Sequence, residues 1–245
     1  MKTFIGATAA ATALLAGAAY ADGPSITGNV ALTSDYAFRG ISQTDGDPAL
    51  QGGFDYTNET SGIPIYAGVW GSSIDFAAQS AELELDVYAG LKPRLNDQVG
   101  FDLGVIGYLY PSASDDGAEL DYIEAYAKVG IDVTPQFAVG GAIYLSPEFT
   151  GETGNGLYAE ASAGYKFNDA FAASGAFGMQ QADDADFDVG AGIDDNYNTW
   201  NAGVTWSPQG DVLAGFSFDA RYMSTDIDNV DAADDRAVFT IKRAM

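Results

Sequence analysis

The sequence predicts an all-β protein, namely a transmembrane antiparallel up-and-down β-barrel of about 12 strands that follows a cleaved N-terminal signal peptide. Three observations support this prediction. Segments of about ten residues alternate apolar and polar side chains, which on a strand separates the two kinds onto opposite faces. Glycine recurs every few residues, and no sustained helical stripe is present. The connections between segments alternate in length and charge.

The first residues read as an export signal. Residues 1–21 contain a basic start at Lys2, an Ala/Leu-rich stretch and a final Ala19-Tyr20-Ala21, the small-x-small pattern that a signal peptidase cuts. A membrane-spanning helix is the weaker interpretation, because the stretch is short and dominated by alanine. We therefore expect a signal peptide at 1–21 and an outer-membrane β-barrel domain at 22–245.

The alternating segments after residue 21 predict the strands. The clearest is residues 82–91, with acids at Glu82, Glu84 and Asp86 and apolar side chains between them. We expect strands centred near residues 34, 53, 69, 87, 104, 126, 141, 161, 175, 202, 219 and 239.

The connections favour a barrel over a secreted β-sandwich, which is the main rival. Short turns are expected at 58–62, 92–98, 132–136 and 168–170, and longer acidic loops at 40–47, 112–119, 147–156, 181–196 and 224–235. A barrel that begins and ends in the periplasm has long outer loops and tight inner turns. A sandwich does not predict this asymmetry.

The two faces of the strands agree with this prediction. Apolar side chains would face lipid, with aromatic girdles formed by Tyr36, Phe38, Trp200 and Tyr222 at one rim and by Tyr56, Tyr165, Phe167, Phe171 and Trp206 at the other. The opposite face is charged and would line a wet lumen. The candidate pore-lining residues are Asp35, Arg39, Asp55, Glu82, Glu84, Asp86, Asp102, Glu124, Lys128, Glu160, Lys166, Asp219, Arg221, Arg236 and Lys242.

Composition limits the possible functions. The chain has 10 basic and 35 acidic residues, a formal charge of −25, and neither histidine nor cysteine. We expect no nucleic-acid partner, because such binding relies on lysine and arginine. We also expect no enzyme activity, no metal and no cofactor, since imidazole and thiolate chemistry are both absent from the sequence. The expected partners are outer-membrane lipid and lipopolysaccharide, the barrel-assembly machinery and small solutes.

One stretch resembles a known family. Asn29-Val30-Ala31-Leu32-Thr33-Ser34-Asp35-Tyr36-Ala37-Phe38-Arg39-Gly40-Ile41-Ser42-Gln43-Thr44, followed by residues 47–56, 66–70 and 73–75, resembles the proteobacterial TorF family of putative porins. The resemblance is specific over about the first fifty residues after the signal peptide. It implies an outer-membrane barrel of porin type without catalytic residues.

Several charged groups leave alternatives open. Asp35 and Arg39, expected on one strand, form either a charged constriction or an ion-pair ladder that only satisfies a polar interior. Carboxylates are abundant enough for a glycosidase-like pair to arise by chance. Residues 184–195 resemble a calcium loop, but Gly190 falls at the seventh position and the twelfth residue is Asp195, so a solvated acidic loop is the preferred interpretation.

Passive diffusion of small hydrophilic solutes across the bacterial outer membrane is the function that we expect. The row of Glu82, Glu84 and Asp86 would give the lumen a mild preference for cations. A barrel of about 12 strands is intermediate in width, so a barrel plugged by its own side chains, with a structural or adhesive role, is the alternative.

Overall fold

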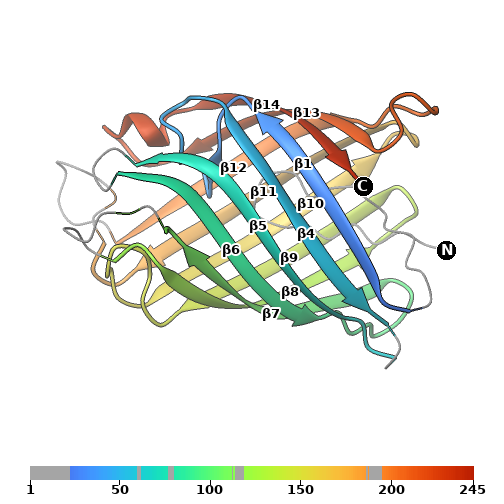
Figure 1. The fold of residues 1–245 in the computed structure, drawn as a ribbon, viewed down its shortest axis with the longest axis horizontal. Helices are drawn as coiled ribbons and strands as arrows, with labels where there is room; N and C mark the ends of the chain where they lie inside the picture. Colours follow the sequence, from blue (N-terminus) through green and yellow to red (C-terminus); the bar gives the residue numbers. More distant parts are fainter. Residues whose placement is uncertain are drawn as a thin grey trace.

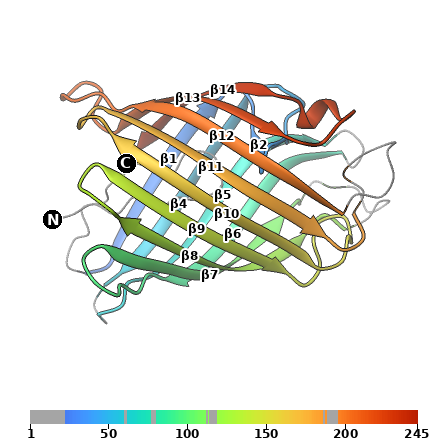
Figure 2. The same cartoon turned by 180° about the vertical axis from the view of Figure 1, so that it is seen from behind.

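The computed structural model describes residues 23–59, 62–76, 80–111, 113, 119–185, 187 and 195–245. Twelve long strands form a closed antiparallel barrel in the order β1-β14-β13-β12-β11-β10-β9-β8-β7-β6-β5-β4 (Figures 1 and 2). The strands are β1 (Ser25–Thr33), β4 (Ala49–Asn58), β5 (Ile65–Phe76), β6 (Ala81–Leu91), β7 (Val99–Leu109), β8 (Tyr122–Asp132), β9 (Phe137–Ser146), β10 (Gly156–Lys166), β11 (Phe171–Ala182), β12 (Asn196–Trp206), β13 (Phe216–Thr225) and β14 (Arg236–Ala244).

Two short strands, β2 (Ala37–Phe38) and β3 (Ile41–Ser42), form a separate pair, and a 3-10 turn, η1 (Asp231–Ala233), precedes β14. No helix in the described part of the chain is long and apolar enough to cross a membrane. The predicted signal peptide lies outside the described residues.

The barrel closes between its first and last strands. β1 pairs with β14 from Asn29↔Ala244 to Thr33↔Thr240, and with β4 from Ser25↔Thr57 to Thr33↔Ala49. Each strand therefore has two neighbours, which leaves no free edge in the wall. The even number of strands brings Ser25 and Ala244 to one end of the barrel. We call this the turn end, because the short connections 133–136 and 167–170 also lie there. The opposite loop end holds the longer connections 110–121, 147–155 and 183–195.

The predicted strand positions are confirmed with one exception. Every expected centre except the first falls inside an observed strand. The first strand, expected near residue 34, ends at Thr33. Residues 34–48, called the inner segment below, instead connect β1 to β4, so the placement of Asp35 and Arg39 on a strand was wrong. Alternation continues beyond Thr33, but Arg39 and Gly40 have positive φ of 49° and 88°, which an extended strand does not allow.

The outer surface of the barrel is apolar. Leu32, Phe54, Val87, Ile143 and Phe239 are each between 47% and 61% exposed. A water-soluble sandwich would bury these positions, whereas a lipid-facing wall exposes them.

The expected aromatic girdles are partly confirmed. Exposed aromatic side chains lie near strand ends as predicted at Tyr56, Tyr165, Phe167, Phe171, Trp206 and Tyr222, whereas the exposed Trp200 lies one residue from the middle of β12. The assignment of Tyr36 and Phe38 to a girdle was wrong. Tyr36 is 1% exposed and belongs to an interior hydrophobic cluster, and Phe38 packs against the same cluster. Both belong to the inner segment, which explains why the outward face predicted for a strand does not apply to them.

Candidate functional site in the barrel lumen

The inner segment occupies the lumen at the loop end. Tyr36 contacts β6, Arg39 contacts β8 and β11, and Gly40 lies against Thr199 of β12 and Thr225 of β13. These contacts reach opposite sides of the wall, so the segment crosses the lumen; Figure 2 labels its strand β2. The prediction that residues 40–47 form an outer loop was therefore wrong for residues 40–44. Only residues 45–48 are exposed.

Two tight turns give the inner segment its shape. Phe38 pairs with Ile41, and the two residues between them, Arg39 and Gly40, both have positive φ. A two-residue type I′ hairpin turn requires this conformation. A second turn is closed by the Asp47 amide, which donates to the carbonyl of Thr44 at 2.9 Å, again across two residues of positive φ, Asp45 and Gly46. The sequence pair Asp-Gly is typical of such turns.

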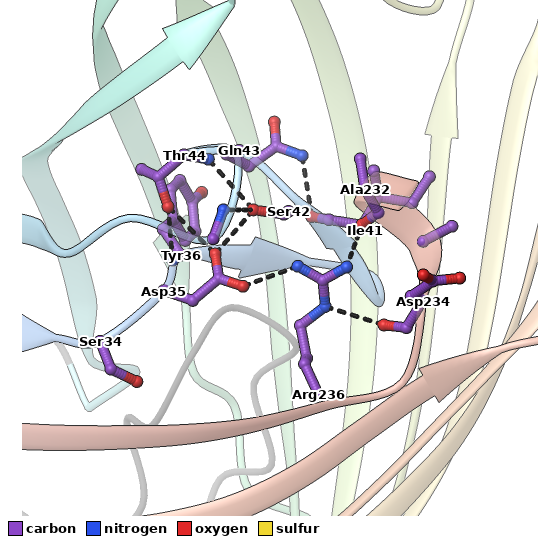
Figure 3. A network of polar contacts seen from close by, with 12 residues as sticks. Ser34, Asp35, Tyr36, Ile41, Ser42, Gln43, Thr44, Ala232, Asp234 and Arg236 are labelled. Atoms are coloured by element: carbon purple, nitrogen blue, oxygen red, sulfur yellow. Dashed lines mark hydrogen bonds and ion pairs between the residues drawn. The ribbon is translucent and has the colours of Figure 1, made fainter. Parts of the chain in front are cut away.

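Asp35 anchors the base of the segment to the wall. The Arg236 guanidinium of β14 donates to the Asp35 carboxylate at 2.6 Å, and the hydroxyls of Ser42 and Thr44 donate to its other oxygen at 2.7 and 3.0 Å (Figure 3). Arg236 also donates to carbonyls of the η1 turn, including that of Ala232. The carboxylate thus joins both arms of the inner segment to the last strand.

Arg39 lies at the tip of the hairpin and is almost completely buried. Its side chain is 1% exposed, and it donates to Glu124 of β8 and to Gln180 of β11, both at 2.6 Å. Its guanidinium carbon lies 4.3 Å from the ring centre of Tyr158 and 5.1 Å from that of Tyr144. A buried charge needs this degree of compensation, because an unpaired one costs several kcal/mol.

Tyr36 joins the inner segment to strand β6. Its hydroxyl donates to Glu84 of β6 at 2.7 Å, and Tyr110 donates to the other oxygen of Glu84 at 3.1 Å. Burial raises the pKa of the Tyr36 phenol, and the carboxylates of Glu84 and Asp86 raise it further. The phenol therefore remains a proton donor at neutral pH.

An aromatic cluster fills the space around the segment. Tyr36, Tyr108, Tyr110, Tyr122 and Phe149 are all at most 7% exposed. The rings of Tyr108 and Tyr122 stack with centres 4.4 Å apart, and Phe149 meets Tyr122 edge-on at 5.0 Å. The lumen is packed at the loop end in the manner of a protein core.

The turn-end half of the lumen is more open and more polar. Tyr88 donates to Asp55 at 2.7 Å, and Tyr66 donates to Asp102 at 2.5 Å while also bonding the hydroxyl of Tyr126. Asp55 and Asp102 are only partly buried. This half consequently presents hydroxyls and charges to a wet space.

Basic groups in this half lie beside acids or rings. Lys128 lies over the ring of Tyr126 at 4.4 Å. Arg221 bonds Asp219 at 3.2 Å, Asn201 at 2.7 Å and Ser174 at 2.9 Å. The lumen at the turn end therefore contains both signs of charge.

The structure places the predicted site residues in three groups. The packed loop-end half contains Asp35, Arg39, Glu84, Asp86, Glu124 and Arg236, and the more open part contains Asp55, Asp102, Lys128, Glu160, Lys166, Asp219, Arg221 and Lys242. Glu82 is exposed near the start of β6, beyond the register shift between Ser73 and Phe76. The shift explains why Glu82 does not continue the inward row of Glu84 and Asp86.

Five lumenal tyrosines belong to the candidate site although the sequence alone did not identify them. Tyr66, Tyr88, Tyr126, Tyr144 and Tyr158 face inward with the charged groups. Their position in the alternation indicates this: Tyr88 follows Asp86 by two residues, and Tyr126 stands between Glu124 and Lys128 at the same spacing. The expectation that aromatic residues face lipid does not predict these inward positions.

The described residues contain no group of three or more acids arranged to hold a metal ion. Most of the calcium-like stretch 184–195 lies outside the described residues, as do parts of the acidic loop 112–119.

Similar folds are found among outer-membrane channels of low sequence identity. The KdgM porin, solved in complex with disordered oligogalacturonate, superposes with a TM-score of 0.55 at 10% identity over 89% of this chain and 96% of that one. The NanC porin gives 0.56 at 10% over 90% and 98%. The COG4313 outer membrane channel from Pseudomonas putida F1 gives 0.56 at 13% over 92% and 96%.

These likenesses establish the fold. No match to a curated protein sequence was found. The closed barrel and its apolar outer surface are those of an integral protein of the bacterial outer membrane. A family model described as "Bacterial protein of unknown function (Gcw_chp)" matches residues 17–245, and the chain therefore belongs to this family.

Proposed function

We propose that the protein is a narrow porin-like channel for passive diffusion of small hydrophilic solutes, with the inner segment as its constriction. The observation that supports this most is the division of the lumen. The turn-end half is lined by partly exposed charges such as Asp55, Asp102 and Lys128, while the loop-end half is packed around Arg39. Partly exposed charges that lead to a packed segment are the lining expected of a narrow channel.

A mild preference for cations is part of the proposal. Arg39 compensates Glu124, and Arg236 compensates Asp35. Glu84 and Asp86 have no basic partner among the ion pairs found in the described residues. Negative charge without a compensating base favours cations in a pore.

The alternative is a plugged barrel with a structural or adhesive role. The burial of Arg39 and of the aromatic cluster favours it, because both fill the lumen. Purified protein in planar bilayers distinguishes the two. A channel gives stepwise conductance, and a silent bilayer with verified insertion refutes the channel. Liposome swelling with solutes of graded size and charge then defines which solutes pass through the channel.

The remaining expectations complete the proposal. We expect no enzyme activity, contact with lipid and lipopolysaccharide, insertion by the barrel-assembly machinery, and membership of the TorF group of porins. The porin fold of the structural neighbours and the absence of histidine and cysteine support the first of these.

A further inference from the structure

Asp86 differs from the buried lumenal acids beside it in its hydrogen bonding. Its side chain lies inside the barrel at 7% exposure, and its Oδ1 atom has no hydrogen-bond partner in the described structure. Leaving a buried polar atom unpaired costs about 1–3 kcal/mol, and more for a charged group. The neighbouring acids are satisfied, since Glu84 accepts from Tyr36 and Tyr110, and Glu124 accepts from Arg39.

Aromatic residues flank Asp86 on both neighbouring strands. In the register of the sheet, Asp86 is directly opposite Trp70 of β5 and Tyr108 of β7. Side chains that face each other in this way have Cβ atoms about 5 Å apart. Trp70 packs edge-on against Tyr36 with ring centres 5.5 Å apart, so the inner segment covers this position from the loop end.

Asp86 also lies at the border between the two halves of the lumen. Two residues toward the loop end is Glu84, which is 2% exposed. Two residues toward the turn end is Tyr88, which is partly exposed and bonded to Asp55. A solute that enters the vestibule from the turn end therefore meets Asp86 as the first carboxylate of the packed half along β6.

We propose that Asp86, Trp70 and Tyr108 form a binding site for small organic cations that carry an ammonium group, at the inner limit of the constriction. An unpaired carboxylate oxygen beside two aromatic side chains matches the chemistry of ammonium recognition, in which aromatic rings attract a cation and a carboxylate neutralises it. A multidentate metal site does not fit, because no group of three acids among the described residues is arranged to hold a metal. The site deepens, and rests on, the proposed channel function.

Trp70 provides a direct optical readout. The chain has three tryptophans, and the other two, Trp200 and Trp206, face outward at 38% and 40% exposure. In the W200F/W206F variant, Trp70 is the sole source of tryptophan fluorescence. Methylammonium chloride is titrated into this variant in lipid vesicles, with sodium chloride keeping the ionic strength constant.

We expect a saturable change of Trp70 emission that is lost when Asp86→Asn is added. The control is Asp132→Asn, which removes the same charge at the end of β8 and keeps the response. Circular dichroism verifies that each variant is folded. A linear or absent response of the Trp70-only protein overturns the site, as does a response that survives Asp86→Asn.

Bilayer recordings separate this inference from the proposed function. In a potassium chloride gradient at neutral pH, we expect the wild-type reversal potential to indicate cation preference and the Asp86→Asn variant to lose most of it. An unchanged reversal potential in Asp86→Asn overturns the site. Silent bilayers together with a saturable Trp70 response refute the channel and support the site. Conducting bilayers without that response refute only the site.

Discussion

Two glycines of the inner segment offer a matched test of how the hairpin tip packs. Gly40 and Gly46 have nearly the same backbone conformation, with φ of 88° and 82°. A Cβ atom on Gly40 would lie 2.4 Å from Thr225 Cγ2, 2.6 Å from Thr199 Oγ1 and 3.3 Å from the Ser224 carbonyl oxygen. A Cβ atom on Gly46 would have no neighbour within 4 Å. Alanine at position 40 would therefore clash with the barrel wall, whereas alanine at position 46 would not.

The difference has a definite expected size. Placing alanine in a left-handed conformation costs about 1–2 kcal/mol at either position. Overpacking adds about 1–3 kcal/mol, and only at Gly40, because two of the three close atoms belong to short side chains and the third is backbone. Each 1.4 kcal/mol is about a factor of ten in an equilibrium. Gly40→Ala should therefore lower the ratio of the packed to the released population of the segment about five- to 150-fold more than Gly46→Ala does.

Single-channel recording measures this population. We expect Gly40→Ala to show larger or more frequent openings than Gly46→Ala, in which the left-handed conformation of alanine is the only added cost. Equal behaviour of the two variants would mean that the contact of the tip with β12 and β13 does not control the lumen.

Three further predictions concern the inner segment and the wall of the barrel. Arg39→Met leaves Glu124 as an uncompensated buried charge and should lower the free energy of unfolding, measured with urea in vesicles, by about 3–5 kcal/mol. The double variant with Glu124→Gln should recover much of this loss. If the losses of the two substitutions are instead additive, Arg39 and Glu124 are not paired. Val87→Arg places a charge on the lipid-facing side of β6 and should cost about 2–4 kcal/mol in the same assay; no loss would mean that this face is not in lipid. Gly68→Ala meets a tyrosine ring at 2.5 Å and should be destabilising, while Gly164→Ala, whose nearest atom is at 3.8 Å, should be tolerated; the reverse order of melting temperatures would refute the inward packing of tyrosine.

Strand positions were predictable because alternation is a local property. In β6, Leu83, Val87 and Ala89 are exposed on one face while Glu84 and Asp86 are buried on the other, as the period of two requires. The wall of a barrel repeats this rule in every strand, and the turn residues mark its limits.

The inner segment was not predictable by the same rule. Phe38, Arg39 and Ile41 continue an alternating pattern, and the sequence does not show that Arg39 and Gly40 reverse the chain inside the lumen. The partners that hold Arg39, Glu124 and Gln180, are 85 and 141 residues away in the sequence. Such contacts depend on the closed barrel, so only the three-dimensional structure reveals which charges meet.

We propose that the inner segment, and not the barrel wall, constricts the lumen. Thr33 and Ala49 are directly paired, so β1 and β4 can be joined by a tight hairpin turn in place of residues 34–48. The most direct measurement is the single-channel conductance of this shortened protein beside that of the wild type, after circular dichroism has verified that both barrels are folded. We predict a several-fold larger conductance for the shortened protein. Equal conductance, or two silent bilayers with verified insertion, would contradict the claim.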